Sequence, residues 1–159
     1  MGTRSTQLAE QFEQAIKEFE QAIDGCSDSQ WKAMCGGEGW TVAATAQHVA
    51  GQFPLEREYI SAAAEGREAP AYTWDDINGK NESRANTNTA ATKADVVKTL
   101  RDGGSSMAGY IRGLSDEQLD RTVKLPLAGG AAVSAEQLIT GGVLIEHVTG
   151  HLQSMRAAG

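Results

Sequence analysis

Histidine, cysteine and proline are scarce in this sequence, and acidic residues outnumber basic ones. The 159 residues include 3 histidines, 2 cysteines and 3 prolines, and 21 Asp and Glu stand against 14 Lys and Arg, which gives a net charge of −7. An acidic surface argues against nucleic acid as a partner, because phosphate binding needs basic residues. Cys26 and Cys35 are too few for a disulfide scaffold, so we expect reduced thiols.

The sequence also has no apolar run of membrane-spanning length, and no charged-then-apolar leader opens it. We therefore expect a cytoplasmic protein with no membrane partner. It has no repeat, low-complexity tract or linker that would divide it, so residues 1–159 are expected to form a single domain. We therefore expect a small-molecule substrate as the partner. The protein could also associate into a homodimer.

Apolar residues recur at three- and four-residue steps in four stretches, which predicts an all-α fold. The second stretch contains Pro54, where we expect a kink because proline removes a backbone hydrogen bond. The last stretch is apolar on most sides and is expected to be the most buried. Four long helices joined by one long crossover predict a four-helix bundle. The predicted helices span Thr6–Asp24, Thr41–Ala64, Thr92–Leu114 and Ser134–Arg156.

The connections carry further signals. Ser27 or Ser29 can cap a short helical turn, from which Trp31 and Met34 would pack inward. Gly66–Asn88 is predicted to be mainly irregular, with helix allowed from Asn78 onward, and irregular stretches of this length are often functional. The remaining signals are a close helix approach or a bend at Gly103–Gly104, a capped turn at Ser115–Leu119, and a short strand or hairpin within Thr122–Val133.

The three histidines are the main chemical signal. His147 and His151 stand four residues apart, so a helix places both on one face. His48 lies within another apolar helical pattern. We hypothesise that all three bind one metal ion; the alternative is that they are core residues bonded to backbone carbonyls. The pair has the spacing of a zincin motif but lacks its glutamate, and no carboxylate at an obvious spacing supplies a general base.

Several segments taken together resemble the DinB/YfiT-like superfamily. The segments that carry the resemblance are Trp31, Gly39–Ala43, Gln47–Ala50, Leu114–Asp120 and Glu146–Arg156, and they cover most of the chain in the right order. The resemblance implies a DinB/YfiT-like four-helix bundle with a long crossover between its second and third helices. It also implies a divalent metal bound by His48, His147 and His151. Nitrogen ligands suit zinc and nickel alike and do not distinguish between them.

Members of this superfamily include mycothiol-dependent maleylpyruvate isomerases, bacillithiol S-transferases and metal-dependent hydrolases. Three neutral ligands leave a metal open for water or substrate, and the metal can hold a thiol as thiolate. The first hypothesis is therefore a metal-dependent transferase that uses a low-molecular-weight thiol. The second is a metal-dependent hydrolase, and the third is a non-catalytic stress-response or binding protein with a structural metal.

The long crossover is expected to lie beside the open side of the metal. Trp74, Asp75, Asn78 and Asn81 are the residues that we expect there, with Asn78 and Asn81 binding substrate. The alternative is a solvated loop or a contact between molecules.

Overall fold

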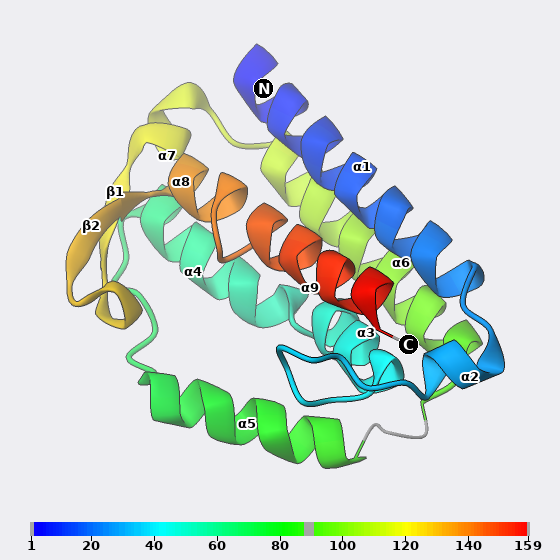
Figure 1. Cartoon of the computed structure of the whole chain (residues 1–159). Coiled ribbons are helices and arrows are strands. Elements are labelled where there is room, and N and C mark those ends of the chain that lie inside the picture. Colours follow the sequence, from blue (N-terminus) through cyan, green and yellow to red (C-terminus); the bar gives the residue numbers. More distant parts are fainter. Residues whose placement is uncertain (1, 88–90, 159) are drawn as a thin grey trace.

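The computed structural model describes residues 2–87 and 91–158, which form a helical bundle with one small hairpin (Figure 1). The predicted all-α four-helix fold is confirmed. In the described residues, no helix is long and apolar enough to cross a membrane. The long elements are α1 (Thr3–Asp24), α3 (Val42–Gly51) with α4 (Phe53–Glu65), α6 (Lys93–Arg112) and α9 (Ile145–Ala157). The crossover carries α5 (Trp74–Thr87), and the short helices are α2 (Asp28–Trp31), α7 (Asp116–Asp120) and α8 (Ala135–Thr140).

Helices α1 and α6 pack along their length and form one side of the bundle. Their buried faces carry the apolar residues that the periodicity predicts, among them Phe12 and Leu100, both fully buried. Gly103 and Gly104 of α6 lie close to neighbouring helices, within one continuous helix. A Cβ atom on Gly103 would lie 2.9 Å from the ring of Phe53, so a larger residue there would push α4 away.

The second predicted helix is two helices, and the interruption precedes Pro54. Helix α3 ends at Gly51, Gln52 links the two helices, and Pro54 lies in the first turn of α4. In that turn a backbone N–H has no partner within the helix, so the missing donor costs nothing. The predicted kink is therefore confirmed, but it lies at Gln52 and not at Pro54.

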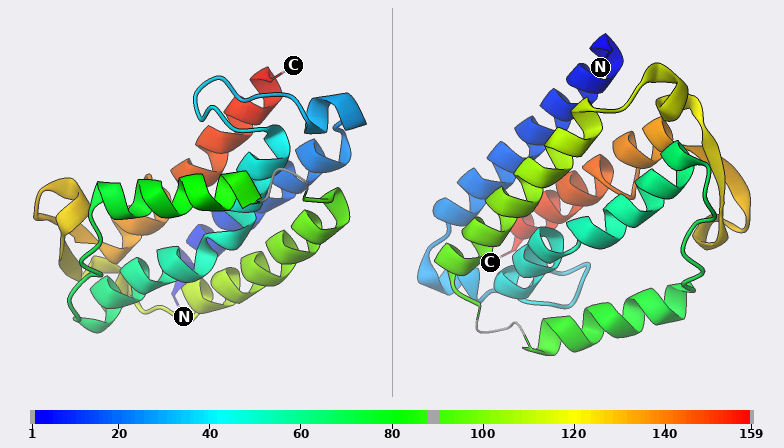
Figure 2. Two further views of the ribbon diagram at one scale, coloured as in Figure 1. Left: turned by 90° about the horizontal axis from the view of Figure 1, so that it is seen from below. Right: turned by 180° about the vertical axis from the view of Figure 1, so that it is seen from behind.

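The crossover was wrongly predicted to be mainly irregular, because α5 begins at Trp74. The Thr73 hydroxyl accepts from the Asp76 N–H at 3.1 Å, and the Asp76 carboxylate accepts from the Thr73 N–H at 3.0 Å. This reciprocal cap satisfies free donors at the helix start, with aspartate in place of the usual glutamate. Figure 2 shows α3 and α4 between α5 and the α1–α6 pair. Asn88, the last residue of the predicted stretch, lies outside the described residues.

The last predicted helix is also interrupted. Ser134 caps α8 as expected, but α8 ends at Thr140 and α9 begins at Ile145. A Cβ atom on Gly141 would lie 2.7 Å from the Gln137 carbonyl oxygen, so this turn accepts only glycine without a shift. The break lets α9 begin one turn before its histidines.

The hairpin and the α2 turn complete the description of the connections. Strands β1 (Thr122–Leu125) and β2 (Ala131–Ser134) pair antiparallel across the short 3-10 helix η1 (Pro126–Ala128), as predicted. Ser27 caps α2 and Trp31 is buried, but Met34 is 56% exposed and does not pack inward as expected.

Candidate metal centre

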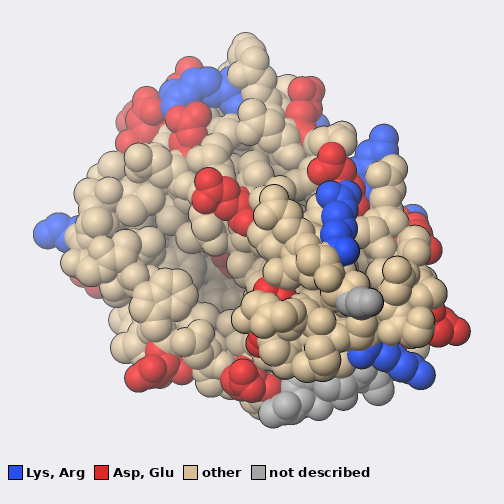
Figure 3. All heavy atoms as spheres, in the orientation of Figure 1, with Lys and Arg blue, Asp and Glu red and all other residues tan. Residues whose placement is uncertain are grey.

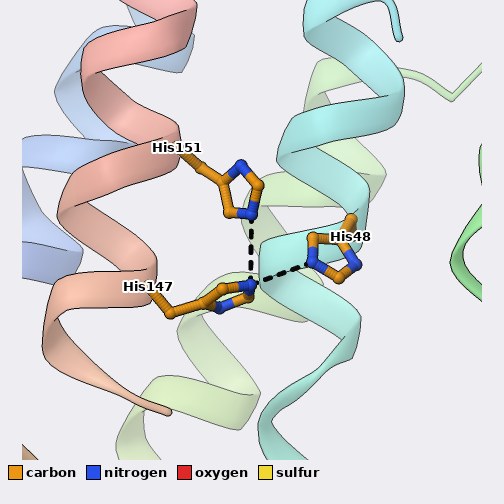
Figure 4. Close-up of side chains that lie close together, drawn as sticks. All are labelled: His48, His147 and His151. Carbon is orange, nitrogen blue, oxygen red and sulfur yellow. Dashed lines mark hydrogen bonds between the residues drawn. The ribbon is translucent and has the colours of Figure 1, made fainter. Parts of the chain in front are cut away.

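The imidazoles of His48, His147 and His151 converge between α3 and α9 (Figure 4). The Nε2 atom of His147 lies 3.0 Å from Nε2 of His48 and 3.1 Å from Nε2 of His151. The three rings meet nearly edge to face, with interplanar angles of 81° to 86°. One nitrogen of each ring therefore points to a common place.

Local sequence explains how the rings meet. His147 and His151 are one turn apart on α9, so both project from the same face toward α3. His48 is buried in the second half of α3, and the edge of the Trp40 indole covers its ring at a centroid distance of 5.3 Å. The short side chains of the alanine-rich α3 allow the helix axes to lie close together.

Two carboxylates lie behind the ring of histidines. Glu56 Oε1 is 3.0 Å from Nδ1 of His147, and Glu38 Oε1 is 3.8 Å from Nδ1 of His151. Glu56 is only 4% exposed. A carboxylate that accepts a hydrogen bond from Nδ1–H leaves the Nε2 lone pair free to bind a metal, and it holds the ring in place.

The ionisation of these groups follows from their burial. Loss of hydration lowers the pKa of His147 and that of His151 to about 4, and the neighbouring His147 adds to the effect on His151. Both imidazoles are therefore neutral at neutral pH, which is the form that binds metals. Burial also raises the pKa of the Glu56 carboxyl well above its ordinary value, because a charge there loses its water shell.

The three imidazoles are better suited to binding one cation than to hydrogen bonding with one another. Nδ1 of His147 lies 3.0 Å from Glu56 without a well-directed hydrogen bond, and its Nε2 offers one lone pair or one N–H, which cannot bond fully to two neighbouring rings. A cation at the centre receives all three lone pairs and leaves Nδ1–H of His147 and His151 facing carboxylates. Tetrahedral zinc with Zn–N near 2.0–2.1 Å would separate its nitrogen ligands by about 3.3 Å, close to the observed spacing.

A cavity of about 170 Å³ opens beside the histidines, where Figure 3 shows a hollow between α5 and the layer of α4 and α9. Asn78 and Asn81 line it, as does Trp74, whose indole N–H donates to the Leu127 carbonyl at 2.9 Å. Asp75 is exposed and is not among the lining residues. The crossover helix thus forms one wall of the space next to His48 and His147.

The sequence interpretation missed both carboxylates. Glu56 lies eight residues after His48, which on a continuous helix is about 80° round from it, and the interruption at Gln52 separates the two, so spacing gave only a weak signal. Glu38 lies in the irregular segment before α3, where no periodicity indicates the direction of a side chain. No carboxylate at an obvious spacing was found in the sequence, and the structure places Glu56 beside His147 and in the lining of the cavity.

The fold and this cluster define a four-helix bundle with a three-histidine centre that can hold a metal ion. The chain belongs to the DinB superfamily, whose family model matches residues 11–155. No curated protein matches it.

Solved structures share the fold of this chain. YfiT from Bacillus subtilis, described as a probable metal-dependent hydrolase with an unusual four-helix bundle topology, has a TM-score of 0.77 and 18% identity over 98% of this chain and 86% of its own. An uncharacterised protein from Clostridium difficile 630 has a TM-score of 0.73 and 13% identity, covering 98% and 95% of the two chains. A mutant of mycothiol-dependent maleylpyruvate isomerase has a TM-score of 0.71 and 15% identity; this chain is covered to 98% but spans 60% of that protein.

Proposed function

We propose that this protein is a metal-dependent transferase that joins a low-molecular-weight thiol to a small electrophile. The observation that carries the proposal is the convergence of three imidazoles beside an open cavity. A centre with three protein ligands leaves room for a further ligand, unlike the closed four-ligand sites of structural zinc. Zinc or nickel is the ion that we expect.

The chain's own residues bind, orient and shield. Nε2 of His48, His147 and His151 would hold the ion, while Glu56 and Glu38 keep Nδ1 of the two α9 histidines directed away from it. A bound divalent ion supplies Lewis acidity, which lowers the pKa of a coordinated thiol so that thiolate is available at neutral pH. Trp40 covers one side of His48 and restricts water there.

The electrophile would enter the cavity between α4, α5 and the start of α9. In the overall reaction, the thiol sulfur bonds to a carbon of the electrophile, the thiol proton is released, and the leaving group departs with the electron pair of its broken bond. Asn78 and Asn81 line the cavity on consecutive positions of one face of α5 and would donate hydrogen bonds to the substrate.

Hydrolysis is the second candidate, because Glu56 offers a carboxylate at the edge of the same cavity. Burial raises the pKa of Glu56, as suits a general base that works near neutral pH. The fold is also that of YfiT, described as a probable metal-dependent hydrolase. A stress-response protein with a structural metal is the non-catalytic alternative.

One experiment separates these functions. Protein that has never touched a nickel column is analysed for metal, loaded with zinc, and tested with thiols and chromogenic electrophiles, then with chromogenic esters in the absence of thiol. Turnover that requires both thiol and metal, and that His151→Ala abolishes, is the expected result. If the protein folds without metal and does not take up zinc, the metal centre is refuted. Ester cleavage that needs no thiol would favour the hydrolase.

The role of the asparagines has its own test. Alanine substitution of Asn78 and of Asn81 is expected to raise KM for the electrophile and to leave zinc content unchanged, because neither belongs to the three residues that would hold the ion. Asp75→Ala, on the same helix but outside the cavity, serves as the control. Unchanged kinetics in both asparagine variants would remove these residues from the substrate site.

A further inference from the structure

The cavity beside the histidines has walls of different chemistry. Residues at helical spacing on α3 and α4 form its floor, one face of α5 forms a second wall, and the segment before α9 forms a third. The lining residues are His48, Gln52, Leu55, Glu56 and Tyr59 below, Trp74, Ile77, Asn78 and Asn81 on α5, and Leu127, Gly142, Val143 and His147 opposite. The space is about 170 Å³, smaller than a typical site for a drug-sized ligand, which takes about 300 Å³ or more.

Charge is almost absent from this lining. Among the described residues that form the cavity, none is Lys, Arg or Asp, and the single ionisable acid is Glu56, which lies against His147. Nothing in the lining would neutralise a carboxylate or phosphate away from the histidines. Burying such an anion without a partner costs several kcal/mol, so the lining disfavours charged substrates. Apolar side chains dominate the remainder, with Leu55, Ile77 and Val143 on three different walls.

The Tyr59 hydroxyl, on a residue that lines the cavity, lacks a hydrogen-bond partner among the described residues, as do the Glu56 carboxylate and Nδ1 of His147. Tyr59 is 3% exposed, and its hydroxyl is buried without a hydrogen bond to any residue that the structure describes. Burial raises the pKa of Tyr59, so the hydroxyl keeps its proton and remains a donor. An unsatisfied buried donor is unfavourable, and a ligand that offers an acceptor oxygen would relieve it. Tyr59 lies one turn beyond Glu56 on α4, about 4.5 Å further along the helix axis.

We propose that this cavity selects a small, uncharged electrophile that carries a hydrogen-bond acceptor such as a carbonyl oxygen. Its apolar body would lie between Leu55, Ile77 and Val143, with the acceptor bonded to the Tyr59 hydroxyl and the reacting carbon toward the histidines. This names the substrate class of the transferase and rests on that proposed function. Tyr59 acts as a specificity residue through one hydrogen bond.

The test uses three probes of similar size that need no turnover. Acetophenone is uncharged and has an acceptor, ethylbenzene has the same shape without an acceptor, and benzoate is an anion. Binding of each to the metal-free protein is measured by NMR titration, because a bound divalent ion would itself attract benzoate. Acetophenone is expected to bind about three- to tenfold more tightly than ethylbenzene, the range for one hydrogen bond, and more tightly than benzoate.

Tyr59→Phe removes only the hydroxyl oxygen. It is expected to weaken acetophenone binding by about three- to tenfold and to leave ethylbenzene binding unchanged. The matched control is Tyr110→Phe, which removes another buried hydroxyl, on α6 and outside the cavity. This control should not change the affinity for either probe.

The outcomes distinguish this inference from the proposed function. Equal binding of acetophenone by wild type and Tyr59→Phe, or tighter binding of benzoate than of acetophenone, would overturn the inference. If Tyr59→Phe does not fold, the acetophenone–ethylbenzene difference in wild type decides, and its absence overturns the inference. Selective acetophenone binding in a protein that transfers no thiol would support the cavity's selectivity while rejecting the transferase.

Discussion

The α1–α6 side of the bundle and the α3–α4 side bury different kinds of residues. Between α1 and α6 the interior is apolar except for Ser5, whose hydroxyl donates to the Arg112 carbonyl at 3.3 Å. Charged residues pair at the surface, as Glu20 with Arg101 and Glu13 with Arg112. Six polar or charged residues are buried in the described part of the chain, and five of them lie on α3, on α4 or at their junction. These five are Thr45, His48, Gln52, Glu56 and Ser61.

This difference separates stability from chemistry. Buried apolar groups stabilise the fold in proportion to the area removed from water, whereas buried polar groups must recover the cost of lost hydration through specific partners. The α1–α6 pair can therefore serve as a rigid support. The α3–α4 layer concentrates groups whose burial requires specific partners, as the Thr41 carbonyl is for the Thr45 hydroxyl at 2.9 Å. Four substitutions or conditions test this division.

The largest effect on stability is expected from Phe12→Ala. Phe12 is fully buried and meets the Phe53 ring edge to face at 5.4 Å, so the substitution leaves a cavity that the packed helices cannot close. We expect the free energy of unfolding to fall by about 3–5 kcal/mol in urea denaturation. Zinc affinity of the folded variant should match that of the wild type. A loss below about 1 kcal/mol would show that the support is not rigid.

His48→Ala is expected to affect metal binding instead. Structural zinc sites gain roughly 10–16 kcal/mol from four ligands, or about 3 kcal/mol for each, so zinc affinity should fall by at least about 100-fold. Calorimetric titration of zinc into the metal-free variant measures this. Phe12→Ala is the control in the other region. Wild-type affinity in the His48 variant would refute the three-histidine centre but leave the bundle intact.

Glu56→Gln should have a smaller effect on the same measurement. The amide keeps the size of the side chain but weakens the acceptor that faces Nδ1 of His147 at 3.0 Å, and zinc affinity is expected to fall by about 10–100-fold. Glu58→Gln, two residues along α4 and exposed, is the matched control. If both variants bind zinc equally well, Glu56 does not position His147.

The smallest effect is expected from a moderate fall in pH. Protons compete with the metal only when the imidazoles can be charged, and burial places the pKa of His147 and that of His151 at about 4 rather than near the ordinary 6.5. Because both values are lowered, occupancy should stay high as pH falls from 7 and should decline only as pH approaches 4. Elemental analysis after dialysis at stepped pH measures this. Release near pH 6.5 would mean that the histidines are hydrated.

The two regions also differ in how well the sequence predicted them. The stripes of α1 and α6 show an unbroken 3.6-residue period, so their inner faces, and the close approach at Gly103, could be predicted. Around the site the predictions were less accurate, because the interruptions at Gln52 and at Gly141 depend on packing as well as on periodicity. The α5 cap was missed because Thr73 and Asp76 satisfy each other in a pattern that also suits a turn.

By itself, the sequence determined the all-α bundle, the helix faces that pack inward, and the presence of His147 and His151 on one helical face. Each of these depends on local spacing, which the backbone geometry of a helix fixes. Only the tertiary structure placed His48 within 3.0 Å of His147, set Glu56 and Glu38 behind the rings, and enclosed Tyr59 in a nearly uncharged cavity. Those contacts join residues far apart in the chain, and their distances depend on how α3, α4, α5 and α9 pack against one another.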